Sequence, residues 1–178
     1  MSYKYNSRFS RTVLGKRDIL WAGFIIVILL LTSITLIKNR YNPIPDQIKQ
    51  NVKFVILYPD KTHSQPVISK SLKYDQSSKV FSFVYSTGTA DITVAEQATP
   101  QAFTDIPQAY DKLVQNLNEY SSFDSYYGKV SLTKPKEFGN QQTAVFNSKG
   151  TLVFAHQTKG NWTKDQWNDL INHLNTIK

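Results

Sequence analysis

Three histidines, His63, His156 and His173, are the residues of this sequence best suited to proton transfer or metal binding. A metal site typically takes two histidines from positions a few residues apart, such as i and i+4 on a helix, together with a carboxylate. These three histidines are instead widely separated along the chain. We therefore expect each to be a surface or partly packed side chain, and we expect no metal site.

Other motifs that carry catalysis are missing from the sequence. None of the serines lies in a G-x-S-x-G elbow or a credible S-x-x-K arrangement, and the acidic residues are isolated rather than paired. The chain has no cysteine, which excludes thiol nucleophiles, disulfides and Cys-ligated metals. Its 7 glycines form no phosphate-binding loop. We therefore predict no catalytic residues, no cofactor and no enzymatic activity.

Four aromatic residues, Tyr120, Phe123, Tyr126 and Tyr127, form the one cluster that could serve as a binding patch. Exposed tyrosines suit contact with a protein or a glycan, because their rigid rings stack at low entropic cost. Alternatively, every second member of the cluster fills the core face of a sheet. The second interpretation is favoured, and the sequence leaves both open.

A run without charged residues, from Ile19 to Leu36, precedes all of these side chains. Its length nearly matches the roughly 30 Å hydrocarbon core of a bilayer, so residues 19–37 are predicted to form a transmembrane helix. Five basic residues and one acidic residue stand before the run, whereas two basic residues follow it closely. This bias predicts a cytoplasmic N-terminus and an extracytoplasmic C-terminal part.

A cleaved secretory signal is the competing interpretation of this run, because such a signal also begins with a basic region. The run is longer than the usual signal core of about 7–15 residues. No A-x-A-like cleavage site precedes Lys38. An uncleaved signal-anchor in a single-pass protein of the cell membrane is therefore favoured.

The formal net charge of +8 divides equally between the N-terminal tail and the rest of the chain. Residues 1–18 carry five basic and one acidic residue, and the remaining sixteen basic and twelve acidic residues give the rest a charge of +4. The outer basic residues are nearly all lysine, whereas bidentate phosphate recognition favours arginine. We therefore expect no nucleic-acid partner, and we expect the basic tail to meet anionic lipid headgroups.

The chain after the span predicts one extracytoplasmic domain. Residues 38–51, which contain two prolines, are predicted to be a linker, and residues 52–178 are predicted to be the domain. Segments rich in β-branched and aromatic residues predict strands at 52–58, 79–85 and 91–95. We expect the adjacent strands of this region to pair as a meander.

The second half of the domain predicts two helices and further strands. Apolar residues at helical spacing within 99–120 predict a helix that has Thr104 or Asp105 as its cap and Pro107 in its first turn, and that ends before Ser121. Strands are expected at 126–132, 143–146 and 151–155. Thr163 is the expected N-cap of a final helix, whose apolar face comprises Trp167, Leu170, Ile171, Leu174 and Ile177. The fold class is therefore α+β, with an antiparallel sheet and two main helices in the order strands, helix, strands, helix.

Two stretches of this domain resemble a known class of protein. The first runs from the strand that ends at Pro59 to the segment ITVAEQATPQAF, and the second is GTLVFAHQTKGNWTKDQWNDLINHL, residues 150–174. They are similar to uncharacterised extracytoplasmic domains of bacterial single-pass proteins, including those appended to anti-sigma-factor-like proteins. The resemblance covers roughly residues 50–178 and carries no catalytic residues to transfer. Because the tail of 18 residues is too short to form a sigma-binding domain, sequestration of a sigma factor is not expected.

These features predict a membrane-anchored extracytoplasmic binding or interaction module. Its expected partners are the lipid bilayer, through Ile19 to Ile37, and an envelope protein or a glycan. One alternative is a subunit of a cell-envelope secretion or conjugation assembly, although the span lacks a G-x-x-x-G packing motif. The other alternative is a membrane-tethered hydrolase with a site that no motif reveals. A histidine near a carboxylate in a cleft would favour that hydrolase.

Overall fold

The computed structural model describes residues 43–63, 66–106 and 108–177. The chain divides into two compact units, 1–42 and 43–178, and the described residues belong to the second unit. The basic tail and the predicted transmembrane helix therefore lie outside the described residues. Among the described residues, no helix has the length and apolar character that a membrane crossing requires.

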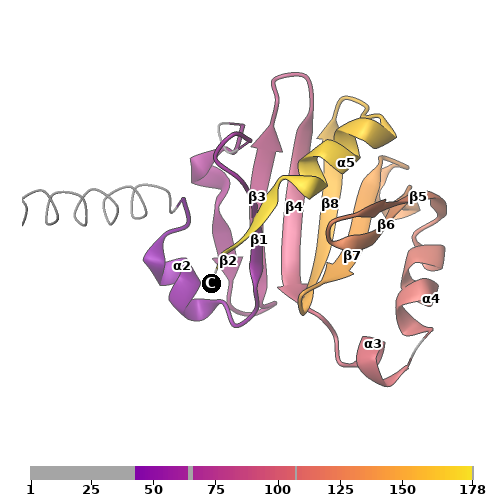
Figure 1. The fold of residues 1–178 in the computed structure, drawn as a ribbon, viewed down its shortest axis with the longest axis horizontal. Coiled ribbons are helices and arrows are strands. Elements are labelled where there is room, and N and C mark those ends of the chain that lie inside the picture. The colour runs from indigo at the N-terminus through magenta and orange to yellow at the C-terminus, as the bar shows by residue number, and fades with distance from the viewer. Residues whose placement is uncertain (1–42, 64–65, 107, 178) are drawn as a thin grey trace, which may run out of the picture. The chain divides into compact units, whose positions relative to one another are not determined.

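A seven-stranded antiparallel sheet forms the centre of the second unit (Figure 1). Its strand order is β2-β3-β4-β8-β7-β6-β5, so most neighbours in the sheet are also neighbours in sequence. The strands are β2 (Lys73–Asp75), β3 (Val80–Ser86), β4 (Asp91–Ala98), β5 (Glu119–Ser125), β6 (Gly128–Thr133), β7 (Thr143–Ser148) and β8 (Thr151–Lys159). The α+β fold class and its antiparallel sheet are thereby confirmed.

Buried and half-buried residues alternate along β3 and β4, and this alternation shows which face of the sheet packs into the main core. Phe81, Phe83 and Tyr85 of β3 are buried, and their neighbours in the strand are half-buried. Ile92 and Val94 continue the same face on β4. Side chains alternate between the two faces of a strand, so this period-2 pattern is what made both strands predictable from the sequence.

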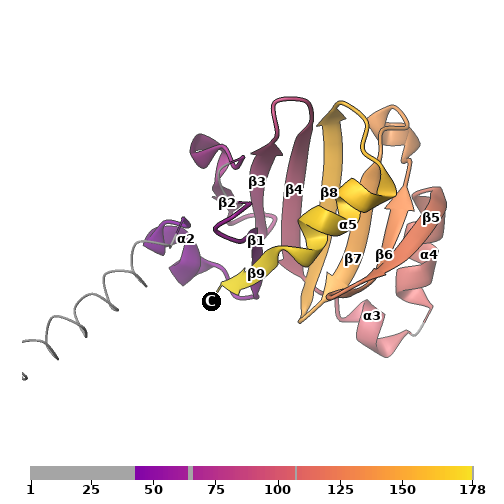
Figure 2. The same ribbon diagram turned by 45° about the horizontal axis from the view of Figure 1, so that its top comes forward.

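A second, two-stranded sheet consists of β1 (Ile56–Pro59) and β9 (Leu174–Ile177), which we call the ribbon. Its strands are antiparallel, with Ile56 opposite Ile177 and Pro59 opposite Leu174. The helix α5 (Lys164–Asn172) leads directly into β9. Figures 1 and 2 both show α5 and the ribbon lying across one face of the large sheet.

The helix α5 begins with the signals that its sequence predicts. Thr163 accepts a hydrogen bond from the backbone N–H of Gln166, and the Gln166 side chain accepts one from the Thr163 backbone N–H. This capping box satisfies two backbone donors at the helix start. Trp167, Leu170 and Ile171 are buried against the main core, as predicted. The prediction is wrong for Leu174 and Ile177, which belong to β9 and not to the helix.

Two short helices, α3 (Ala102–Asp105) and α4 (Ala109–Asn116), belong to a second hydrophobic cluster. Val114 of α4 packs there with Val145 of β7 and Leu152 of β8. Because Ala144 and Phe146 on either side of Val145 belong to the main core, this second cluster lies on the opposite face of the sheet. The central strands are therefore covered on both faces.

The helix predicted from about Pro107 to Tyr120 is shorter in the structure, where it is α4 and its last two residues belong to β5. The helix α3, which precedes it, was not predicted. Ile106 has extended backbone angles (φ −125°, ψ 100°), the conformation preferred by a residue that precedes proline. At the other end, Asn118 adopts a positive φ of 56° and ends the helical region before β5 begins. The strand predicted at 126–132 accordingly begins later, as β6.

The predicted linker, residues 38–51, also differs from the structure. From Pro43 onward these residues belong to the compact unit and form the helix α2 (Asp46–Asn51). Ile44 is fully buried in the main core, and Ile48 packs against it. Of the strand predicted at 52–58, only residues 56–58 are strand in the structure, as part of β1, and α2 ends just before the predicted start.

Candidate functional site

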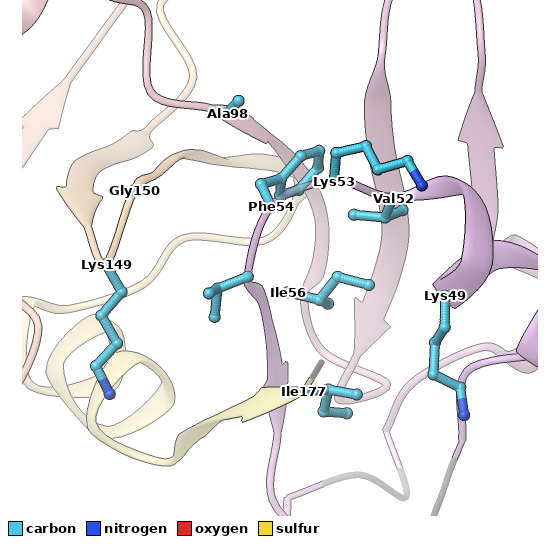
Figure 3. Close-up of a pocket in the computed structure, with 10 residues that line it drawn as sticks. Lys49, Val52, Lys53, Phe54, Ile56, Ala98, Lys149, Gly150 and Ile177 are labelled. Carbon is cyan, nitrogen blue, oxygen red and sulfur yellow. The ribbon is translucent and has the colours of Figure 1, made fainter.

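A concave groove of about 490 Å³ lies beside the ribbon, at the end where Ile56 and Ile177 pair (Figure 3). Its apolar lining comes from the segment entering β1, from the end of β9 and from the end of β4, and lysines complete its border. The residues of the groove are Lys49, Val52, Lys53, Phe54, Val55, Ile56, Ala98, Lys149, Gly150 and Ile177. Volumes of this order are typical of sites for small ligands.

The three lysines of the groove come from two parts of the chain. Lys49 lies on α2, Lys53 follows that helix, and Lys149 lies in the turn between β7 and β8. Figure 3 shows Lys149 on the side of the groove opposite Lys49 and Lys53. Positive φ angles at Lys149 (52°) and Gly150 (78°) mark a tight two-residue hairpin turn, which fixes the position of Lys149.

The charges of these lysines are only partly neutralised by their neighbours. The Lys49 ammonium lies 2.6 Å from Asp46, and the Lys53 ammonium donates to the Gln50 carbonyl oxygen at 3.1 Å. The Lys149 ammonium lies 5.2 Å from the ring centre of Tyr126, a cation–π contact without a negative charge. The three lysines and Asp46 together leave the border of the groove with a net charge of about +2.

The predicted aromatic patch is divided by the structure. Tyr126 and Tyr120 are exposed, with 75% and 46% of their surface accessible. Phe123 and Tyr127 are instead buried in the main core, so they cannot form part of an open surface. The core interpretation is therefore confirmed for Phe123 and Tyr127, and Tyr120 and Tyr126 are accessible to a partner. The role of the exposed tyrosines in binding stays a prediction.

Lys149 connects the groove to the exposed part of that aromatic cluster. Its ammonium lies over the rings of both Tyr126 and Tyr127, which contact each other edge to face at 5.1 Å. The Tyr126 backbone N–H donates to the Asn172 side chain at the end of α5, at 2.8 Å. The groove and Tyr126 therefore form one continuous surface, to which the sequence pointed only through its tyrosines.

Two of the three histidines, which we expected to be separate surface or partly packed side chains, come together in the structure. The rings of His63 and His173 are stacked with their centres 4.0 Å apart. His63 Nδ1 lies 3.2 Å from Asp60 Oδ1, and both rings lie within 3.4 Å of the Asp169 carboxylate. We call Asp60, His63, Asp169 and His173 the histidine cluster.

Pairing of β1 with β9 brings this cluster together. Asp60 directly follows β1 and His173 directly precedes β9, and the Asp60 N–H donates to the His173 carbonyl oxygen at 2.8 Å. Burial alone would raise the pKa of Asp60, but hydrogen bonds from Thr62 and His63 lower it to about 2. The Asp60 carboxylate is therefore ionised at neutral pH and held in a fixed turn.

His156 lies on β8 and remains separate from this cluster. Its Nδ1 lies 2.9 Å from the Thr143 hydroxyl on β7, and burial lowers its pKa. His156 is therefore a partly packed side chain, as predicted.

No match to this chain was found among models of protein families, among curated proteins or among solved structures.

Proposed function

We propose that this chain is a membrane-anchored, extracytoplasmic binding module whose groove holds an anionic phospholipid of its own membrane. The observation that carries the proposal is the composition of the groove, an apolar floor bordered by lysines on both sides. Such a border favours an anionic group, and the floor favours a hydrocarbon portion attached to it.

The apolar floor supports an amphipathic ligand rather than a free anion. Phe54 and Val55 are only half-buried, although both pack against the main core, and Ile177 beside them is half-buried as well. Burying their remaining surface against an acyl chain would contribute roughly 25 cal/mol for each Å² removed from water. A small, strongly hydrated anion would gain nothing from this floor.

The predicted anchor supports a ligand from the same bilayer. Only five residues separate the predicted end of the span at Ile37 from Pro43, the first residue of the compact unit. Five residues extend over at most about 18 Å, so such an anchor keeps the domain close to the headgroups. Tethering of this kind raises the effective concentration of lipid at the groove.

Vesicle binding by residues 43–178, first shown by a cooperative melt to be folded, tests the proposal. We expect binding to vesicles that contain phosphatidylglycerol and not to pure phosphatidylcholine, with affinity falling as salt is added. Replacing both Lys53 and Lys149 with Glu should weaken binding at least about tenfold, because each basic residue contributes about 1 kcal/mol at such a surface.

Lys112→Glu is the matched control for these charge reversals. Lys112 is an exposed lysine on α4, which packs on the opposite face of the sheet. The Lys112→Glu variant should bind anionic vesicles with the affinity of the native domain. Equal losses in Lys112→Glu and in the single groove variants Lys53→Glu and Lys149→Glu, which change the charge by the same amount, would mean that net charge alone governs binding. Such a result, or failure of the native domain to bind anionic vesicles, would contradict the lipid proposal and leave an envelope protein or glycan as the partner to seek.

The orientation in the proposal has its own test. Protease added to intact cells should remove the C-terminal domain and spare the basic tail. A fully protected C-terminal domain would reverse the predicted orientation. A mature protein that begins between residues 34 and 40 would show that the apolar run is a cleaved signal.

A further inference from the structure

We propose that the histidine cluster binds one divalent transition-metal ion of the Zn²⁺ class, with His63, His173 and Asp60 as its ligands. This site is independent of the groove, because it lies at the other end of the ribbon and shares no residue with it.

The ligand atoms are already close enough for coordination. One ligand atom from each of Asp60, His63 and His173 lies within 4.8 Å of the other two. Ligands of a tetrahedral zinc ion, bound at about 2.1 Å, are about 3.4 Å apart. Side-chain rotation can close that difference without moving the backbone, which the β1–β9 hydrogen bonds hold in place.

Neighbouring groups hold the imidazoles in the way that metal ligands are held. His173 Nδ1 lies 2.8 Å from the Asp169 carbonyl oxygen, so Nδ1–H is the donor and Nε2 carries the free lone pair. A ligating histidine commonly donates its other N–H to a carbonyl or a carboxylate in this manner. The Asp169 carboxylate lies 3.4 Å from His63 Nε2, where it can orient that ring or complete the ligand set.

The charge and exposure of the cluster also suit a cation. With neutral imidazoles, the carboxylates of Asp60 and Asp169 give it a formal charge of about −2. The side chains of His63 and Asp60 are 23% and 25% exposed, so an ion can enter while part of its surroundings stays dry. Attraction between an ion and carboxylates is stronger in such a partly desolvated site than in bulk water.

The donor types select among metals. Imidazole nitrogens favour Zn²⁺, Ni²⁺ and Cu²⁺, whereas Mg²⁺ and Ca²⁺ prefer sites made of oxygen alone. Three protein ligands leave one position for water or for a partner's side chain. Bound metal would also join the loop after β1 to the junction of α5 and β9, and so close the ribbon at this end.

Zn²⁺ titration of the full chain in nonionic detergent, prepared without a polyhistidine tag, tests the site. Isothermal calorimetry should give one ion per chain, and Co²⁺ in place of Zn²⁺ should give a visible absorption band. His63→Ala and His173→Ala should each weaken Zn²⁺ binding at least tenfold, and Asp60→Asn should weaken it as well. The melting temperature of the native chain should rise with Zn²⁺ and that of these variants should not.

His156→Ala is the matched control, since His156 is the one remaining histidine of a chain without cysteine. It should bind Zn²⁺ like the native chain. His63→Gln, which preserves more of the side-chain volume, replaces His63→Ala if the latter fails to fold. Zn²⁺ binding that survives in both histidine variants, that depends on His156, or that is absent from the native chain would overturn the proposal.

Discussion

The seven-stranded sheet and the ribbon are assembled by different kinds of contact. In the sheet, the pairs β3–β4, β5–β6 and β7–β8 are hairpins whose strands follow one another in sequence. In the ribbon, the first and last strands of the described domain come together. Pairing in most of the sheet is therefore local, whereas the ribbon forms only when the two ends of the domain meet.

Both candidate sites lie at the ends of the ribbon. Ile56 and Ile177, which pair at one end, line the groove. Pro59 and Leu174, which pair at the other end, are followed and preceded by Asp60 and His173. Each end of the ribbon therefore contributes residues to one site, and α2, β4 and the β7–β8 turn complete the groove. Substitutions that loosen the ribbon from the sheet should therefore disturb both sites together.

Trp167→Ala should have the largest effect on this arrangement. The Trp167 ring is fully buried, contacts Trp162 edge to face at 5.1 Å and donates from Nε1 to the Gln142 side chain at 3.1 Å. Its removal leaves a large cavity between α5 and the sheet and should lower the free energy of unfolding by about 3–5 kcal/mol.

Urea denaturation of residues 43–178 measures that loss. Lys164→Ala, an exposed change on the same helix, should stay within about 0.5 kcal/mol of the native value. An unchanged midpoint for Trp167→Ala would mean that α5 contributes little to holding the ribbon on the sheet.

The contrast between sheet and ribbon also explains what could be predicted from the sequence. The alternating burial of β3 and β4 is visible in their local sequence, β7 and β8 are runs rich in β-branched and aromatic residues, and the start of α5 carries a local capping signal. The anchor prediction lies outside the described residues. Leu174 and Ile177 continue the helical spacing of α5, so nothing local shows that the chain changes to a strand after His173.

The histidine cluster was missed for the same physical reason. His63 and His173 meet only because β9 pairs with β1, and that pairing is invisible when β9 is assigned to a helix. The groove was missed because Lys149 comes from a segment about 100 residues away from Lys49 and Lys53. A pattern search along the chain finds local spacing, whereas both sites depend on register between distant strands.

Glu96→Gln should produce the next largest effect, visible as a change in pH dependence. Glu96 on β4 is fully buried, and its Oε2 accepts a hydrogen bond from the Leu57 N–H of the ribbon at 3.0 Å. Burial raises the pKa of the Glu96 carboxyl well above its usual range, although the hydrogen bond from Leu57 opposes this shift. The folded domain therefore retains a proton on Glu96 that the unfolded chain loses.

The sign of the effect follows from this difference. Stability from Glu96 is fully present below about pH 4.5 and falls as the pH rises toward its raised pKa in the folded state. The loss is on the order of 1 kcal/mol for each pH unit in that window. Gln at this position keeps an acceptor for Leu57 and cannot ionise.

Unfolding measured between pH 5 and 8 should therefore show a steeper decline for the native domain than for Glu96→Gln. Comparing the two proteins removes the contribution of His156, whose lowered pKa acts in the opposite direction. Parallel pH profiles for the two proteins would show that Glu96 is ionised in the folded state.

Tyr127→Phe should have the smallest effect and should act on one end of the ribbon. The buried Tyr127 hydroxyl, on the turn between β5 and β6, donates to the Leu174 carbonyl oxygen at the start of β9. Losing this hydrogen bond should lower the free energy of unfolding by about 1 kcal/mol and should speed amide hydrogen exchange in β9 more than in β3 and β4.

Tyr126→Phe is the control. The Tyr126 ring is exposed, so this substitution should change neither the free energy of unfolding nor the exchange in β9. Since Leu174 directly follows His173, Tyr127→Phe should also weaken Zn²⁺ binding slightly. If exchange instead rises uniformly over sheet and ribbon, the two regions unfold as one unit and the separation drawn between them does not hold.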